Sequence, residues 1–333
     1  MDSVFDDVGG TLKMGKYFGT DGIRRIANTE LTPELVYKVA KAGAYVLSKH
    51  TDHAPTIFIG RDTRISGTLI ESAMTAGFLS YGANVKMLGV MPTPAVAYLT
   101  KKFKADASVV ISASHNTFEF NGVKYFSNKG MKIPDELEEE IEEVMDSGKI
   151  NELTAVNDKI GTSEIATELL DEYVYFFRKN FEEDLEKLNR DDFVVAVDTA
   201  NGATSVVADK VFTVLGIKHH ILNDSPNGIN INDGCGSTHL EMLKQYVIDK
   251  KCSLGIAYDG DGDRCLAVDE NGNEIDGDKI IAIISQYLKS KEKLNKDTIV
   301  ATVMSNLGLN KYAKQKARAG SARACFNSCF LWE

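Results

Sequence analysis

The stretch Tyr258-Asp259-Gly260-Asp261-Gly262-Asp263-Arg264 decides how this chain is interpreted. It places three carboxylates at alternate positions directly after the apolar run from Ser253 to Tyr258, and the apolar run from Cys265 to Val268 follows it. The two glycines permit a turn tight enough for the carboxylates to converge, and oxygen ligands in near-octahedral geometry suit Mg²⁺. The apolar flanks predict a loop at the mouth of a buried sheet, where it binds a divalent cation.

Two other interpretations of this loop are possible from its composition. Most Asp/Gly-rich stretches are solvated acidic turns, but those lack apolar strands on both sides. A calcium-binding EF-hand is the other, because four acidic residues fall at its first, third, fifth and twelfth positions: Asp259, Asp261, Asp263 and Glu270. The sixth position, which requires glycine, is Arg264, and the flanks predict strands where an EF-hand needs helices.

Apolar runs alternate with helix-length amphipathic segments along most of the chain. This pattern predicts tandem α/β domains with mixed, mainly parallel sheets. The expected strands are Thr56–Ile59, Asn84–Leu88, Ala107–Ser112, Phe193–Val197, His219–Leu222, Ser253–Tyr258 and Thr298–Met304. The expected helices are Leu69–Tyr81, Pro134–Met145, Glu164–Phe177, Ser205–Leu215, His239–Asp249 and Lys279–Leu288.

The polar segment from Asp146 to Gly161 predicts a linker, and a second boundary is expected near Asn271 to Gly277. We therefore expect a disordered extension over residues 1–13, a first domain over 14–155, a second over 156–273 and an incomplete third over 274–333. The basic stretch without acidic residues between Asp297 and Glu333 predicts an atypical C-terminal tail.

Composition excludes several classes of protein. The chain has 333 residues, 43% of them hydrophobic, and a net charge of −10 that is spread along its length, which argues against nucleic acid or an anionic membrane as a partner. No apolar run approaches the roughly 18 residues that span a bilayer, and the first residues do not resemble a signal peptide. We expect a cytoplasmic protein whose five cysteines are reduced thiols.

Two further stretches carry candidate catalytic groups. Ser112-Ala113-Ser114-His115-Asn116 leaves a buried strand, which places Ser114 at the carboxyl end of a strand, where open α/β sheets hold their ligands. A serine there can accept a phosphoryl group, although an ordinary turn would have the same composition. Lys124 lies in an apolar run, where burial can lower the pKa of a lysine and fit it for proton transfer, although such lysines more often reach solvent.

Two arginine-rich loops, Gly19 to Arg25 and Gly60 to Gly67, are candidate anion sites. A hydroxyl nucleophile, a metal loop, arginines for phosphate and a lysine for proton transfer are together the groups that phosphoryl transfer requires. The chain has neither the Gly-rich loop of nucleotide-binding ATPases nor the kinase motifs.

These stretches together resemble the α-D-phosphohexomutase superfamily. The resemblance runs from about Lys16 to about Gly308 and is carried by four segments in the same order: Gly19–Arg24, Ser112–Asn116, Asn121–Phe126 and Asp259–Arg264. Within the superfamily the chain is most similar to the bacterial branch that acts on glucosamine phosphates, through Asn227–Asn232, Cys235–His239, Asp263–Cys265 and Met304–Gly308.

The resemblance implies a role for each candidate residue. Ser114 would carry the phosphoryl group, and Mg²⁺ would be bound by an oxygen of that phosphate together with Asp259, Asp261 and Asp263. Lys124 would transfer protons beside the nucleophile. The remaining residues of the phosphoryl site would be Arg24, His115 and Arg264.

The implied reaction is an intramolecular phosphotransfer of the isomerase class. Phosphate passes from Ser114 to glucosamine 6-phosphate, a hexose 1,6-bisphosphate intermediate turns around in the site, and glucosamine 1-phosphate is released for UDP-N-acetylglucosamine synthesis. Alternatives are a phosphomannomutase or phosphoglucomutase, or a non-catalytic fragment that binds a sugar phosphate.

The chain departs from the pattern of the superfamily in three respects. Thr117 stands where a proline is usual after Ser-His-Asn, and Arg25 stands where glycine is common. The superfamily has four domains, and we expect the third to be incomplete here and the fourth to be absent, together with the loops that recognise the sugar and the distal phosphate. Loss of that remote binding energy predicts severely reduced turnover.

Overall fold

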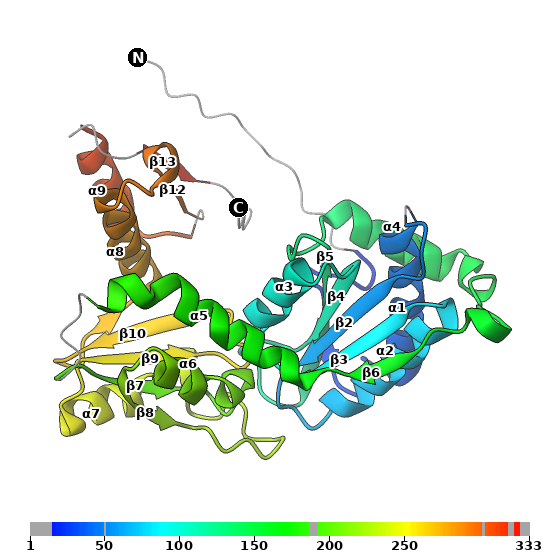
Figure 1. The fold of residues 1–333 in the computed structure, drawn as a ribbon, viewed down its shortest axis with the longest axis horizontal. Helices are drawn as coiled ribbons and strands as arrows, with labels where there is room; N and C mark the ends of the chain where they lie inside the picture. The colour runs from blue at the N-terminus through cyan, green and yellow to red at the C-terminus, as the bar shows by residue number, and fades with distance from the viewer. Residues whose placement is uncertain (1–14, 50, 187–191, 302–303, 319–322, 327–333) are drawn as a thin grey trace.

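The computed structural model describes residues 15–49, 51–186, 192–301, 304–318 and 323–326. Two α/β units are joined by helix α5 (Leu170–Leu185), which runs along both of them, and a smaller helical segment stands beside the second unit (Figure 1). The expected disordered extension over residues 1–13 and the end of the expected tail lie outside the described residues.

The first unit is built on a six-stranded mixed sheet with the order β1-β5-β4-β2-β3-β6. Its strands are β1 (Ile23–Ile26), β2 (Thr56–Arg61), β3 (Asn84–Val90), β4 (Ala107–Ile111), β5 (Phe120–Ser127) and β6 (Ser163–Ile165). Strand β2 pairs in parallel with β3 and β4, whereas β5 is antiparallel to both of its neighbours. The three strands expected here from the sequence are therefore confirmed, within a mixed, mainly parallel sheet.

Helices cover both faces of this sheet. They are α1 (Pro33–Ser48), α2 (Gly67–Tyr81), α3 (Thr93–Lys102) and α4 (Asp135–Asp146). On one face α1, α2 and α4 bury residues such as Val39, Phe78 and Ile141 in one core cluster. On the other face α3 and α5 enclose a second cluster that includes Leu99 and Tyr173. This arrangement leaves the carboxyl ends of β2 and β4 free to carry functional loops.

The second unit contains a five-stranded sheet with the order β11-β10-β9-β7-β8. Its strands are β7 (Val194–Asp198), β8 (Lys218–Leu222), β9 (Leu254–Tyr258), β10 (Cys265–Asp269) and β11 (Glu274–Ile275), and its helices are α6 (Ala208–Val214) and α7 (Glu241–Lys250). Strands β9 and β10 form an antiparallel hairpin whose turn is the aspartate loop. Since both flanks of that loop are strands, the rejection of an EF-hand is confirmed.

The last described segment consists of α8 (Gly277–Ser290), β12 (Thr298–Ala301), α9 (Leu307–Arg318) and β13 (Arg323–Phe326). The side chain of Asp276 caps α8 by accepting a hydrogen bond from the backbone N–H of Lys279. Strands β12 and β13 pair in parallel. Among the described residues no helix is both long enough and apolar enough to cross a bilayer.

The structure corrects the prediction for the segment that links the two units. Ser163–Ile165 is a strand that pairs with β3, so the helix expected from Glu164 begins only at Leu170. Lys86 on β3 forms a 2.7 Å ion pair with Glu164, which holds this edge strand in the sheet. The sheet of the first unit therefore includes a strand that lies past residue 155.

Candidate functional site

The two loops singled out in the sequence meet where the two units face each other. The Ser114 loop follows β4 of the first sheet, and the aspartate loop follows β9 of the second. The start of α3 joins them, because Thr93 donates hydrogen bonds to Asp261 from both its backbone N–H (2.9 Å, to the carbonyl) and its hydroxyl (2.7 Å, to Oδ2). Ser114 and Asp259, which are 145 positions apart in the chain, are also in contact.

Ser114 is buried and has an unusual backbone conformation. Its φ is +53°, in the left-handed region that residues with a Cβ rarely occupy. Its backbone N–H donates to Ser112 Oγ at 2.9 Å, and its hydroxyl donates to Asp259 Oδ2 at 2.5 Å. The hydroxyl group therefore points directly at the aspartate loop.

The three aspartates of the loop converge as the sequence predicted. Carboxylate oxygens of Asp259, Asp261 and Asp263 lie within 4.8 Å of one another, and the first two residues are fully buried. Burial and the two neighbouring carboxylates raise the pKa of Asp259 to about 7, while the buried Asp261 Oδ1 has no hydrogen-bond partner among the described residues. An unpartnered oxygen among crowded carboxylates is the environment that a hard divalent cation would satisfy.

Lys124, on β5, lies against these carboxylates. Its Nζ is 2.9 Å from Asp21, 3.4 Å from Asp261 and 3.2 Å from Asp263. Burial alone would lower the pKa of Lys124, but the surrounding negative charges outweigh it and raise the pKa above its usual value. The sequence expectation of a lowered pKa is therefore wrong for the metal-free chain, because Lys124 is itself the counter-ion of the aspartates.

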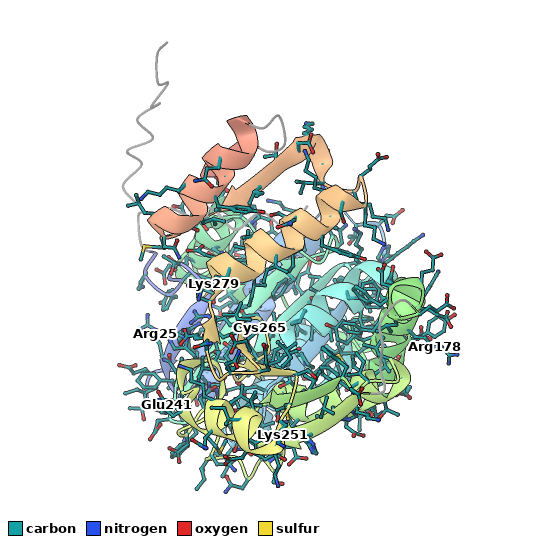
Figure 2. The ribbon with its side chains drawn as sticks, turned by 90° about the vertical axis from the view of Figure 1, so that its left-hand side faces the viewer. Arg25, Arg178, Glu241, Lys251, Cys265 and Lys279 are labelled. Carbon is teal, nitrogen blue, oxygen red and sulfur yellow. The ribbon has the colours of Figure 1, made fainter. Side chains whose placement is uncertain are left out.

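The other three predicted residues lie around the same point. His115 follows Ser114, and burial together with the positive charges of Arg264 and Arg24 lowers the pKa of His115. Its buried Nδ1 has no hydrogen-bond partner among the described residues, which leaves it available to a ligand. Figure 2 labels Arg25 on β1 and Cys265 on β10, the sequence neighbours of Arg24 and Arg264.

Arg64 does not form the anion site that the sequence predicted for its loop. It is 1% exposed, and its Nε donates to Asp62 Oδ2 at 2.8 Å. Its two terminal nitrogens donate to four backbone carbonyls, those of Ser114, Asn116, Thr117 and Phe120. With every donor occupied, this guanidinium holds the Ser114 loop instead of binding an anion.

Sequence reasoning missed two residues of this arrangement. Asp62 is fully buried and also accepts a 2.6 Å hydrogen bond from Ser112 Oγ. Asn232, in the second unit, donates from Nδ2 to the carbonyls of Ser114 and Asn116, both at 2.9 Å. The Asp-x-Arg spacing at Asp62 was one available signal, since it matches a short-range ion pair that a turn could bury.

Family profiles match most of the chain. The profile of "Phosphoglucomutase/phosphomannomutase, alpha/beta/alpha domain I" matches residues 15–152, that of domain II matches 171–272, and that of domain III matches 276–319. The domain II match contains the aspartate loop, and the domain I match contains Ser114 and Lys124.

Curated relatives agree with this assignment. A phosphoglucosamine mutase of Acetivibrio thermocellus is 51% identical over 303 residues, covering 91% of this chain and 66% of its own length. Another phosphoglucosamine mutase, from Clostridium acetobutylicum, is 51% identical over 296 residues, covering 89% of this chain and 65% of its own length. The chain thus spans slightly less than two thirds of the length of the curated relatives it matches.

Solved structures share the fold. A phosphoglucomutase/phosphomannomutase family protein from Burkholderia thailandensis matches with a TM-score of 0.79 and 20% identity, over 94% of this chain and 66% of that one. Aspergillus fumigatus N-acetylphosphoglucosamine mutase, in complex with GlcNAc-6P and magnesium, matches with a TM-score of 0.61 and 15% identity, over 95% and 62%. Profiles, relatives and fold together show that the chain belongs to the phosphoglucomutase/phosphomannomutase family of α-D-phosphohexomutases.

Proposed function

We propose that the protein is a phosphoglucosamine mutase, which interconverts glucosamine 6-phosphate and glucosamine 1-phosphate through a phosphoserine at Ser114. The choice of a hexosamine substrate rests on relatives about 50% identical that carry this name. The observation that supports the chemistry is the contact between the buried Ser114 hydroxyl and the Asp259 carboxylate, with Lys124 bound to the same aspartate loop.

We further propose Mg²⁺ as the cation of the aspartate loop. Asp259, Asp261 and Asp263 would bind it together with a phosphate oxygen on Ser114, and the oxygen-only donor set fits this ion. When bound, the ion would neutralise charge on the transferring phosphoryl group. The Gly260 and Gly262 backbone supports this site, because a Cβ at Gly260 would lie 2.6 Å from the carbonyl of Ser114.

In the proposed forward step, the hydroxyl at carbon 1 of glucosamine 6-phosphate attacks the phosphorus carried by Ser114. The bond between phosphorus and Ser114 Oγ breaks, Oγ takes up a proton, and the attacking hydroxyl gives one up. The bisphosphate then turns around, Ser114 Oγ attacks the phosphorus at carbon 6, and glucosamine 1-phosphate leaves. We assign proton transfer to Lys124, which pairs with Asp261 and Asp263 of the loop that Ser114 Oγ contacts.

The remaining predicted residues are assigned to phosphate binding. Arg24 and Arg264 would contact the phosphoryl oxygens, and His115 would contact them through its unpartnered Nδ1. We also propose a cytoplasmic protein with a domain boundary near residue 273. Its small-molecule partners would be hexosamine phosphates and a hexose 1,6-bisphosphate.

Phosphorylation of Ser114 tests this function directly. The chain is incubated with Mg²⁺ and glucosamine 1,6-bisphosphate, and intact-protein mass spectrometry should show a gain of one phosphoryl group while glucosamine monophosphate is released. Conversion of glucosamine 6-phosphate to glucosamine 1-phosphate is then measured by a coupled assay. Ser114→Ala should abolish both signals, whereas Ser72→Ala, at an exposed serine on α2, should leave them unchanged.

The two readouts separate the hypotheses. A phosphorylated wild-type chain that turns over glucosamine 6-phosphate supports the mutase. A chain that is phosphorylated but prefers mannose or glucose phosphates would move the proposal to another member of the family. A folded wild-type chain that gains no phosphoryl group would refute it.

A further inference from the structure

The backbone of the Ser114 loop is held from both α/β units at once. The carbonyl of Ser114 accepts hydrogen bonds from Arg64 Nη2 of the first unit at 3.0 Å and from Asn232 Nδ2 of the second unit at 2.9 Å. The carbonyl of Asn116 accepts from the same two groups, at 2.8 and 2.9 Å. Each of these carbonyls thus uses both of its lone pairs, one toward each unit.

These bonds act on a backbone that would not choose its conformation unaided. A non-glycine residue in the left-handed region costs roughly 1–2 kcal/mol, and Ser114 has a φ of +53°. Such conformations persist only where the surroundings over-determine them. Four hydrogen bonds onto two carbonyls of one tight turn provide that constraint, and they fix the direction in which Ser114 Oγ points.

Asn232 is itself firmly anchored, so it can hold the Ser114 loop. It is 5% exposed, its φ is +58°, and its backbone N–H donates to the carbonyl of Ala200 at 2.9 Å. Gly260 of the aspartate loop packs beside it, since a Cβ there would lie 2.8 Å from Asn232 Nδ2. One amide group therefore contacts the serine loop while lying against the aspartate loop, so it is placed to keep the two in register.

We propose that Asn232 is a positioning residue for phosphoryl transfer, which works with Arg64 to hold Ser114 Oγ in line with the aspartate loop. The inference rests on the proposed function, because it concerns the rate at which Ser114 accepts and donates a phosphoryl group. In this proposal Asn232 contacts neither the sugar nor the phosphate, and it acts only through the backbone of the Ser114 loop. Misplacement of a reacting group by about 1 Å can cost about 100-fold in rate.

Two variants of Asn232 separate positioning from simple packing. Asn232→Gly keeps the left-handed backbone accessible and removes the amide donor. Asn232→Asp keeps the shape but points a carboxylate oxygen at two carbonyl oxygens, so its effect should be larger. Asn223→Gly is the matched control, because Asn223 also has a positive φ, of +52°, and donates from Nδ2, but to Asp198 and not to the Ser114 loop.

The measurement is the single-turnover rate of Ser114 phosphorylation over a range of glucosamine 1,6-bisphosphate concentrations. For Asn232→Gly we expect the rate at saturating donor to fall about 100-fold, with little change in the half-saturating donor concentration or in the Mg²⁺ affinity of the unphosphorylated chain. Asn223→Gly should retain the wild-type rate. Thermal unfolding of each variant shows whether a loss of rate merely follows a loss of stability.

Each outcome decides the proposal. Equal rates in Asn232→Gly and Asn223→Gly, or a loss confined to donor affinity, overturn it. If Asn232→Gly does not fold, Arg64→Lys takes its place, because a lysine keeps the charge but cannot donate to both carbonyls in the forked geometry, and an unchanged rate at saturation would again overturn it. A wild-type chain that is never phosphorylated refutes the proposed function, and a phosphorylated wild type with fully active variants refutes only this inference.

Discussion

Ser114 lies between two charged groups, the Asp62–Arg64 pair and the aspartate loop with Lys124. They differ in whether their charges and hydrogen bonds are satisfied. On its backbone side, Asp62 and Arg64 form a closed pair in which the guanidinium donates to a carboxylate and four carbonyls. On its side-chain side, Lys124 pairs with Asp261 and Asp263 of the aspartate loop and with Asp21, and Asp261 Oδ1 has no partner among the described residues. The first group is complete without a ligand, whereas the second is stabilised only when positive charge is added.

This difference teaches how a structural charge differs from a functional one. A buried pair that satisfies all its donors makes a rigid support, and removing one partner leaves the other desolvated and uncompensated. A cluster of like charges stores electrostatic repulsion that a cation or a proton relieves. The site thus combines a support that is complete by itself with a loop that we propose to respond to metal and pH, and the predictions below test each half against the other.

The largest effect on stability is expected at the Asp62–Arg64 pair, which we call the closed side of Ser114. Arg64→Met leaves the Asp62 carboxylate buried without its counter-ion and four carbonyls short of a donor. The free energy of unfolding should therefore fall by about 3–5 kcal/mol, as measured by urea denaturation. Arg61→Met, at the end of β2, removes a 3.1 Å pair with the buried Glu71 but leaves every hydrogen bond to the Ser114 loop in place, so it should cost less than Arg64→Met. Similar losses in both variants would show that Arg64 is not the support inferred here.

The aspartate loop, which we call the open side of Ser114, should respond most strongly to metal. Adding Mg²⁺ at 100 times its dissociation constant should raise the free energy of unfolding of the wild-type chain by about 2.7 kcal/mol, and EDTA should reverse the gain. Asp259→Asn, which neutralises the carboxylate with the raised pKa, should lose most of this response while keeping the metal-free fold. Arg61→Met should respond like the wild type. A response that persists undiminished in Asp259→Asn would place the cation elsewhere.

The metal-free chain should also become less stable as the pH rises through the neutral range. Burial and its neighbouring carboxylates raise the pKa of Asp259 from 3.8 to about 7, so between these values the folded state binds more protons than the unfolded state. The stability contributed by the protonated form is therefore complete below pH 3.8 and lost as the pH rises through about 7. We expect the free energy of unfolding to fall by about 2 kcal/mol between pH 5 and pH 7, measured by denaturation in EDTA.

A second carboxyl contributes to the same pH window and must be removed for a clean test. Burial raises the pKa of Glu138, on α4, to about 7, although Lys132 opposes this shift. The measurement is therefore made in the Glu138→Gln background, where Asp259→Asn should reduce the remaining slope, although Asp62 and Asp263, whose pKa values are also raised, keep part of it. A slope that Asp259→Asn leaves intact would mean that the aspartate loop does not store the repulsion described above.

The open side was predictable from sequence because its ligands are local. Asp259, Asp261 and Asp263 lie within five positions between two apolar strands, and Ser114 directly follows another, so composition and order were sufficient. Strands β2, β3 and β4 of the first sheet and β7 to β10 of the second were predictable for the same reason, whereas β1 and β5 were not predicted and β6 was predicted as part of a helix. The proposed sugar specificity could not be derived from local chemistry, and it rests on the resemblance of motifs such as Asn227–Asn232 and on the names of the relatives.

The closed side was mispredicted because its partners are remote. Arg61 and Arg64 look alike in sequence, but Arg64 is buried because carbonyls of residues 114–120 arrive to accept its donors. Asn232 reaches the same carbonyls from the other unit, 118 positions away from Ser114. Local composition cannot say which of two arginines will be enclosed, since that depends on backbone groups placed by the whole fold.

The smallest predicted effect concerns Thr117, which stands where the resemblance to the superfamily led us to expect proline. Its carbonyl accepts from Arg64, but among the described residues no hydrogen bond from its backbone N–H is found, and its φ is not positive. Thr117→Pro therefore removes no backbone donor that the fold uses, and it loses only the hydroxyl that hydrogen-bonds the exposed Glu119. Because it also restricts the unfolded chain, it should stabilise by at most about 0.4–1 kcal/mol. Because Arg64 already fixes this turn, the phosphorylation rate of Ser114 should not change. A faster rate in Thr117→Pro would show that Arg64 and Asn232 leave the loop mobile, which would weaken the contrast between a rigid support and a responsive metal loop.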